Sequence, residues 1–249
     1  MPRQARKKSD NGIYHIILRG INKQVIFEDE EDSAIFLSIL REYKEISGYK
    51  LFAYCLMGNH VHLLIKAEQE PLEKIFRRVS GKYVFWYNNK YQRIGHLFQD
   101  RYKSEPVDTD AYLLTVIRYI HQNPLKSKLA KSVDDYLYSS YKEYIGDQKV
   151  PLTDTEFVLN IVSKAEFIKY HAETNHDSCL EITEKVFYLT DEDAKKLILT
   201  TAQCRATTDI QQFDVKIRNE IIHKLKKQGL SIRQLSRLTG ISKSVIEKS

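Results

Sequence analysis

The interpretation of the whole chain depends on one segment, Leu56-Met57-Gly58-Asn59-His60-Val61-His62-Leu63-Leu64-Ile65. It is a short apolar run, rich in branched residues and entered through Gly58-Asn59, which predicts a β-strand after a tight turn. Successive side chains of a strand point to opposite faces, so His60 and His62 share one face, about 7 Å apart along the strand. Two neutral imidazoles in this arrangement can hold one divalent metal ion.

The histidine pair also has a plainer interpretation. A histidine in a strand is usually a hydrogen-bonded structural residue, but burying two of them side by side requires several partners. The spacing alone therefore leaves a metal site and a structural pair about equally favoured. His15, which lies in an earlier apolar run, has no neighbour at ligand spacing, and we interpret it as structural, with substrate contact the weaker alternative.

The flanking sequence predicts a sheet with helices packed on it. Strands are expected over 14–20 and 49–57, the second forming a hairpin with the histidine strand, and a helix is expected between them, ending at Gly48. A helix over 72–89 and a strand over 97–107 follow. This order is that of the split βαβ, ferredoxin-like or RRM-like sheet, an α+β fold with two helices on one face. We expect the histidines on the opposite face or at its edge.

A further helix should carry the second half of a candidate active site. It is expected to begin at Thr109, a good N-cap, and to end near Gln122, because Asn123-Pro124 disfavours further helix. Tyr119 and Asn123 lie one turn apart on a stripe outside the expected buried face. The tyrosine-rich segment 134–141 is then expected to pack back onto the sheet.

Positive charge is concentrated at the end of the 249-residue chain. Residues 214–249 hold nine Lys and Arg against three Asp and Glu, and so account for the whole net charge of +6. A basic module on a neutral body suggests a polyanionic partner, although a solvated helix face is the simpler alternative. The hydrophobic content of 42% is enough for a real core.

The last residues show helix-turn-helix spacing. Helices are expected over 213–228 and 231–238 and from 242 onward, with small Ser236, turn-forming Gly240 and apolar Ile246 at matching intervals. Lys243 and Ser244 would then face a DNA major groove; a helical bundle or a protein-docking module is the alternative. With a linker near Gly146, we expect three parts: a catalytic domain over 1–146, a helical connector over 147–206 and a helix-turn-helix module over 207–249.

Other features bear on partners and location. Basic residues interleaved with aromatic ones in the helix over 72–89 suit single-stranded nucleic acid, although any one ring is more often core. The candidate phosphate contacts are Lys74, Arg77, Arg78, Lys82, Arg101 and Lys103. Three widely spaced cysteines without a C-x-x-C motif indicate a reducing, cytoplasmic setting, and nothing approaches a membrane span, so no membrane partner is expected.

The set of motifs resembles a known family. His60-Val61-His62, preceded by Met57-Gly58-Asn59, resembles the HUH signature of single-tyrosine transposases, and Arg118-Tyr119-Ile120-His121-Gln122-Asn123-Pro124 resembles their nucleophile helix. Three further segments are similar to the branch of REP-associated tyrosine transposases: Tyr14-His15, Phe98-Gln99-Asp100-Arg101-Tyr102 and Tyr138-Ser139-Ser140-Tyr141. The resemblance covers roughly residues 12–145 and implies an HUH nuclease fold and a DNA transposase.

The resemblance also implies a mechanism. His60 and His62 would hold Mg²⁺ or Mn²⁺, and Tyr119 would attack a scissile phosphate, forming a 5′-phosphotyrosine and freeing a 3′-hydroxyl. Several relatives use a Gln one turn after the tyrosine as third ligand; here that position is Asn123, one methylene shorter. The implied partner is single-stranded DNA, usually with a hairpin beside the cleavage site. The resemblance leaves open a homodimer that shares its active site between chains.

The sequence leaves two other functions open. The first is a non-catalytic nucleic-acid-binding regulator, a domesticated transposase with structural histidines; the missing RRM aromatic signature counts against an RRM-like binding sheet. The second is a metal-dependent phosphodiesterase that uses water. It needs a second metal-binding or general-base cluster, and the sequence shows none.

Overall fold

The structure of the chain is a computed structural model that describes residues 6–146, 151–173, 177, 179–180 and 191–249. The chain divides into two compact units, Met1–Ile182 and Thr183–Ser249. In the larger unit the described strands and helices are, in chain order, β1 (Ile13–Arg19), the 3-10 turn η1 (Ile21–Lys23), α1 (Glu30–Ser47), β2 (Lys50–Met57), β3 (His60–Lys66), α2 (Leu72–Lys90), β4 (Lys103–Pro106), α3 (Asp110–Lys126), α4 (Tyr141–Ile145), α5 (Thr155–Leu159) and α6 (Lys164–Ala172).

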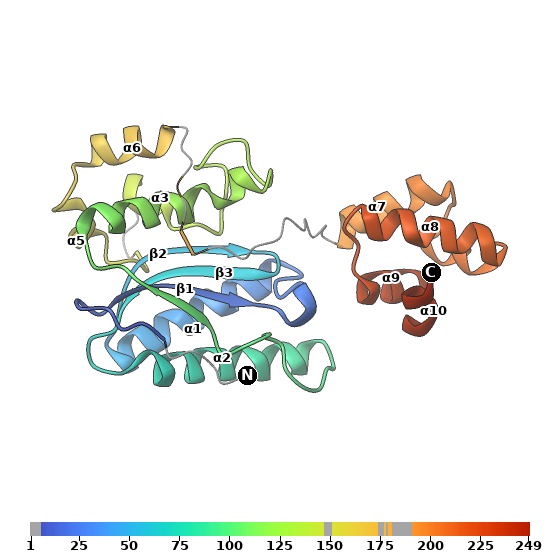
Figure 1. Cartoon of the computed structure of the whole chain (residues 1–249), viewed down its shortest axis with the longest axis horizontal. Helices are drawn as coiled ribbons and strands as arrows, with labels where there is room; N and C mark the ends of the chain where they lie inside the picture. Colours follow the sequence, from blue (N-terminus) through green and yellow to red (C-terminus); the bar gives the residue numbers. More distant parts are fainter. Residues whose placement is uncertain (1–5, 147–150, 174–176, 178, 181–190) are drawn as a thin grey trace. The chain divides into compact units, whose positions relative to one another are not determined.

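The larger unit is built around one antiparallel sheet with the strand order β2-β3-β1-β4. This is the predicted split βαβ arrangement, which is confirmed. Helices α1 and α2 cover one face of the sheet and α3 covers the other (Figure 1). Alternation along β3 sends Leu63 into the core under α1 and α2, and Leu64 into the core under α3. Each face of the sheet therefore has an apolar core of its own.

Strand β4 is shorter than the predicted strand over 97–107. Only Lys103–Pro106 pairs with β1 as a strand, and residues before it form a loop joined to Gly20 by one isolated bridge at Phe98. Leu97 and Phe98 are neighbours in sequence, yet both turn into the core under α1 and α2. An alternating strand cannot send two successive side chains to one face, so the chain departs from extended geometry here.

Helix α3 is longer than predicted. It begins at the expected N-cap, where the Thr109 hydroxyl accepts from the backbone N–H of Tyr112, but it continues through Pro124 to Lys126. The predicted end near Gln122 is therefore wrong. A proline so close to the C-terminus removes only one backbone hydrogen bond, and the Asn123 side-chain amide donates to the Tyr119 carbonyl at 3.0 Å in the same turn.

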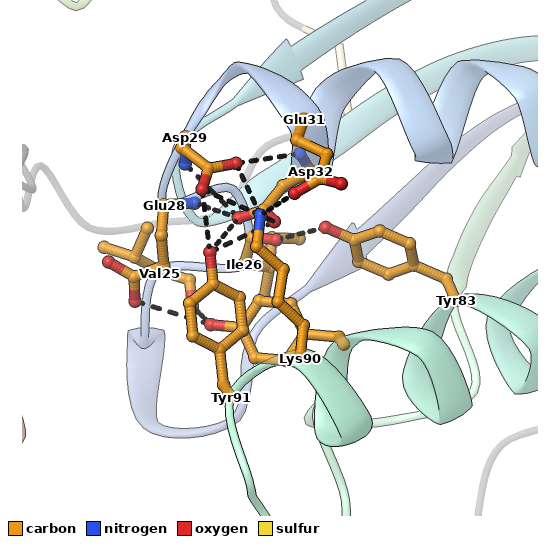
Figure 2. Close-up of polar contacts among 10 residues, drawn as sticks. Val25, Ile26, Glu28, Asp29, Glu31, Asp32, Tyr83, Lys90 and Tyr91 are labelled. Carbon is orange, nitrogen blue, oxygen red and sulfur yellow. Dashed lines mark hydrogen bonds and ion pairs between the residues drawn. The ribbon is translucent and has the colours of Figure 1, made fainter.

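A polar cluster joins the start of α1 to the end of α2 (Figure 2). Asp29 and Asp32 form a capping box at the N-terminus of α1, and Asp32 is completely buried. The Lys90 ammonium lies 2.7 Å from Asp29 and 2.9 Å from Asp32, and the Tyr91 hydroxyl donates to Asp32 at 2.9 Å. The buried carboxylate is thus fully partnered, and it fixes where α2 lies against α1.

The edge of β2 is covered by a tyrosine-rich segment, as predicted. The backbone N–H of Leu56 donates to the Tyr138 carbonyl at 2.9 Å, and that of Ser140 donates to the Tyr54 carbonyl at 3.0 Å. After this segment, α5 and α6 bury Val158 and Phe167 in the core under α3. The chain therefore divides near residue 182 and not at the boundaries expected at 146 and 206, because these short helices depend on the core of the larger unit.

The smaller unit is helical, as predicted for the C-terminal region. Its described elements are α7 (Asp191–Ala202), the 3-10 turn η2 (Thr207–Gln212), α8 (Val215–Lys227), α9 (Ile232–Thr239) and α10 (Lys243–Lys248). Its core is separate and includes Ile198, Leu225 and Ile246. Ser231 caps α9, and Gly240 ends it with a φ of +74°, in the left-handed region that favours glycine. Among the described helices of both units, none is long and apolar enough to cross a membrane.

Candidate active site on the α3 face of the sheet

His60 and His62 lie side by side on β3, on the face covered by α3. Their ring centroids are 5.0 Å apart and their planes are nearly perpendicular. His62 is buried, whereas His60, at the first position of the strand, is partly exposed. The pair therefore lies opposite α1 and α2, at the end of β3 that follows the Gly58-Asn59 turn.

Helix α3 brings Tyr119 to this pair. The Tyr119 ring meets the His62 ring edge-on, with centroids 5.8 Å apart, and the tyrosine side chain is only 2% exposed. Asn123, one turn later, is buried, and its carboxamide nitrogen is used in the bond to the Tyr119 carbonyl, so its oxygen remains an acceptor. Lys126 places its ammonium 4.5 Å from the centre of the Tyr119 ring.

Both imidazoles of the pair are neutral at neutral pH. Burial lowers the pKa of His60 to about 3, with the positive charge of Arg19 acting in the same direction. Burial likewise holds the pKa of His62 far below its usual value. Neutral imidazole is the form that can offer a lone pair to a metal ion.

The bonding of His60 shows which nitrogen is available. His60 Nδ1 lies 2.7 Å from the side-chain oxygen of Asn59, which can only accept, so Nδ1 carries the proton. The amide nitrogen of Asn59 donates to the Lys23 carbonyl at 3.4 Å, which supports this orientation of the amide. The Nε2 lone pair of His60 is left for another partner.

Two residues that the sequence interpretation did not assign to the site belong to it. His15 on β1 is completely buried, stacks on His62 with centroids 5.3 Å apart and meets Tyr119 edge-on at 5.8 Å. Arg19 pairs directly with His60 in the β1–β3 register, and its buried Nε has no hydrogen-bond partner among the residues that the structure describes. The signal that could have found them is strand parity, because odd-numbered residues of β1 share the histidine face once β1 is paired with β3.

The predicted DNA contacts separate into groups. Lys74, Arg77 and Arg101 line a cavity of about 770 Å³ between α2 and the loop before β4, with Phe76 and Tyr102 among its apolar walls. His60 and His62 are not among the residues that line this cavity. They form a second candidate surface on the α2 side of the larger unit.

The remaining candidates have other surroundings. Arg78 is paired with Glu70, which also holds Lys74, and Lys82 is paired with Glu42 of α1, so these cations already have carboxylate partners. Lys103 is exposed on β4. The two candidates of the smaller unit, Lys243 and Ser244, are exposed in the first turn of α10.

Comparison with known proteins identifies the larger unit. Residues 8–123 match the family model of IS200-like transposases. This part of the chain belongs to the IS200-like transposase family. The matched residues include His15, His60, His62, Tyr119 and Asn123, so the whole cluster on the α3 face lies within the transposase domain. No curated protein matches the sequence.

Two solved structures resemble the chain. A REP-associated tyrosine transposase bound to a REP hairpin aligns with a TM-score of 0.53 and 14% identity, over 61% of this chain and 90% of that one. A candidate transposase from Deinococcus radiodurans R1 aligns with 20% identity over 49% of this chain and 97% of that one, with a TM-score of 0.35. The first likeness shows a common fold for the transposase domain.

The residues of the transposase domain fit a divalent metal ion in part. His60 offers an Nε2 lone pair, and His62 is neutral and adjacent. Within the residues that the structure describes, no cluster of three or more His, Cys, Asp or Glu side chains is arranged to hold a metal. Among the described residues, the carboxamide oxygen of Asn123 is a further group of the kind that a divalent cation accepts as a ligand.

Proposed function

We propose that this transposase cleaves and rejoins single-stranded DNA through Tyr119, with Mg²⁺ or Mn²⁺ held by His60 and His62. The observation that supports it best is the packing of the Tyr119 ring against His62, next to a second neutral imidazole. The proposed nucleophile and the proposed metal ligands come from distant parts of the sequence and are in contact, as this function requires.

In the proposed reaction the Tyr119 oxygen attacks the phosphorus in line with the leaving 3′-oxygen. The phosphorus–O3′ bond breaks, the 5′-phosphate becomes attached to the tyrosine, and the leaving oxygen takes up a proton as a 3′-hydroxyl. A bound Mg²⁺ or Mn²⁺ would polarise the scissile phosphate and neutralise charge on its oxygens. Attack of a 3′-hydroxyl on the phosphotyrosine reverses the step, so strands are rejoined without ATP.

Residues around the site contribute charge and position. The guanidinium of Arg19, beside His60 and with an unpartnered Nε, is suited to donate to an oxygen of the scissile phosphate. The Lys126 ammonium next to the Tyr119 ring favours the phenolate, because a phenol with a pKa of about 10 needs help to lose its proton. Asn123 would complete the metal site through its oxygen.

DNA recognition is assigned to two surfaces. Arg77 and Arg101, on the rim of the cavity beside α2, would contact the backbone of a hairpin, a ligand also bound by the REP-associated relative. In the smaller unit, α9, the turn at Gly240 and α10 support the helix-turn-helix assignment, with Lys243 and Ser244 facing the groove. Arg78 and Lys82 hold α2 against its surroundings and are weaker candidates.

The proposal is tested by incubating the full chain with Mn²⁺ and labelled hairpin oligonucleotides. We expect a protein–DNA adduct that survives denaturant, disappears in Tyr119→Phe and after chelation of the metal, and persists in the control Tyr141→Phe. The His60→Ala, His62→Ala double variant should also lose the adduct. Binding without an adduct would instead support a non-catalytic regulator, and a nicked product without an adduct would support hydrolysis by water.

A further inference from the structure

A glutamate and a histidine form a row with His62 across three neighbouring strands. His15 on β1 pairs in register with Glu105 on β4 on one side and with Leu64 on β3 on the other. His15 Nε2 lies 3.0 Å from His62 Nδ1, and His15 Nδ1 lies 3.7 Å from a carboxylate oxygen of Glu105. The order Glu105, His15, His62 therefore leads from the edge strand into the active site.

The carboxylate determines the direction of proton donation along this row. Burial tends to raise the pKa of Glu105, but the His15 ring, whose Nδ1 lies in ion-pair range at 3.7 Å, and the hydrogen bond from the backbone N–H of Leu180 outweigh it and hold the pKa below its usual value. An ionised carboxylate can only accept, and it would repel a lone pair on the nitrogen that faces it. His15 therefore carries its proton on Nδ1.

A proton on His15 Nδ1 fixes the state of His62. A completely buried imidazole is favoured in its uncharged form with a single proton, so a His15 protonated on Nδ1 has a lone pair on Nε2, which accepts from His62 Nδ1–H at 3.0 Å. The Nε2 of His62 is then unprotonated, like that of His60, whose Nδ1–H is held by Asn59. Two separate partners thus place both histidines in the same tautomer, the one that binds metal through Nε2.

We propose that Glu105 and His15 are positioning residues that fix the tautomer of His62 and so prepare the metal site. The proposal rests on the metal role given above to His60 and His62. A purely structural His15 would need only to fill space and satisfy its nitrogens. The row found here does more, because its carboxylate end imposes one direction on the hydrogen bond that reaches His62.

The first measurement uses no metal and no DNA. The full chain is labelled with ¹⁵N-histidine, and two-bond ¹H–¹⁵N spectra report which nitrogen of each ring is protonated; the His62 signals are assigned by their loss in His62→Ala. We expect Nδ1–H in the wild type and a substantial Nε2–H population in His15→Leu and in Glu105→Ala. The proposal is overturned if His62 is already Nε2–H in the wild type, or remains Nδ1–H in both variants.

The second measurement is Mn²⁺ affinity, from the electron paramagnetic resonance signal of the free ion. Loss of such a supporting residue weakens metal binding by about 10- to 100-fold. We expect this loss in both variants, and no change in His171→Leu, which removes an equally buried histidine from another 3.0 Å histidine pair. Unchanged affinity in folded His15→Leu and Glu105→Ala would overturn the proposal. A wild type that binds no Mn²⁺ would contradict the proposed metal site itself. The tautomer spectra would still show whether Glu105 and His15 fix the tautomer of His62.

Discussion

At the scale of single residues, Arg19 places a positive charge beside the histidine pair. Its register partner is His60, its guanidinium lowers the pKa of that histidine, and its buried Nε lacks a hydrogen-bond partner within the described part of the chain. A buried donor left unbonded costs about 1–3 kcal/mol, so a ligand that accepts from it is favoured. The oxygens of a scissile phosphate would supply that acceptor.

Substitution of Arg19 should therefore reduce cleavage more than folding. We expect Arg19→Gln to slow adduct formation by about 100-fold, the typical effect of removing one donor to developing charge. Arg19→Lys keeps the charge but loses the planar guanidinium, so its rate of adduct formation should lie between those of the wild type and Arg19→Gln. Single-turnover rates with a saturating oligonucleotide provide the measurement, and a wild-type rate in Arg19→Gln would remove this residue from the site.

The site residues differ in how far the sequence could reveal them. The shared face of His60 and His62 follows from strand alternation alone, their association with Tyr119 is suggested by the helix pattern, and its role as nucleophile comes from the family resemblance. The place of His15 depends on which strand lies beside β3, which is long-range information that its own neighbours in sequence do not contain. The same is true of Arg19.

At the scale of elements, α3 is tied to its surroundings by a directed chain of hydrogen bonds. His171 Nδ1 on α6 donates to the Phe167 carbonyl at 2.8 Å, so its Nε2 accepts from His121 Nδ1 on α3 at 3.0 Å. His121 Nε2 then accepts from the Ser140 hydroxyl at 2.8 Å. Each ring nitrogen of His121 and His171 thus has a hydrogen-bond partner, provided that both rings are neutral.

The hydrogen bonds that join His171, His121 and Ser140 predict that the protein loses stability in mild acid. Burial, aided by the charge of Arg118, lowers the pKa of His171 to about 4, and the hydrogen bond to Phe167 only partly opposes the shift. The unfolded chain binds this proton below pH 6.5 and the folded chain does not, so the stabilisation is complete above 6.5 and is lost as pH falls toward 4. We expect this histidine to contribute about 2 kcal/mol to the loss of stability between pH 7 and 5, measured as the difference between the wild type and His171→Leu in urea unfolding followed by the fluorescence of Trp86.

The control for the pH prediction is His171→Leu. This variant lacks the titrating group, so its free energy of unfolding should vary less with pH over the same range than that of the wild type. Equal slopes in the two proteins would assign the acid sensitivity to other groups.

The corner between α1 and α2 predicts unequal effects for neighbouring acids (Figure 2). Both Glu31 and Asp32 lie within ion-pair distance of Lys90, but the Glu31 side chain is 64% exposed and that of Asp32 is not exposed at all. We expect Asp32→Ala to lower the free energy of unfolding by about 2–4 kcal/mol and Glu31→Ala by under about 0.5 kcal/mol. Similar small losses in both variants would contradict the role given to the buried carboxylate.

The elements themselves were largely predictable, because alternation and helical periodicity are local signals. The exceptions have tertiary causes. Packing of Leu97 and Phe98 into one core shortens β4, and the two final residues of α3 beyond Pro124 are retained in a packed helix. Short helices α5 and α6 could not be assigned to a unit from the sequence, since their apolar residues complete a core made elsewhere.

At the scale of the whole molecule, two units with separate cores divide the charge unequally. The transposase domain is followed by a small helical unit that contains the basic segment 214–249. DNA cleavage by the larger unit and DNA binding by the smaller unit would then each have their own salt dependence, because each phosphate contact releases its own counterions.

This separation predicts that Lys243→Ala affects binding but not chemistry. The slope of log affinity for duplex DNA against log salt should fall by about 1, as expected for one lost phosphate contact. The yield of the covalent adduct on a short hairpin should stay at the wild-type level. A loss of adduct in this variant would show that the smaller unit takes part in cleavage.

The burial of Tyr119 has a consequence for when the protein can act. A side chain that is 2% exposed should resist nitration by a water-borne reagent until DNA is bound, and mass spectrometry of the modified peptide can check this. The reactive oxygen would then be presented only to a strand able to move α3 or the groups packed on it. Such burial would prevent cleavage of non-target DNA, because nonspecific binding would leave Tyr119 inaccessible.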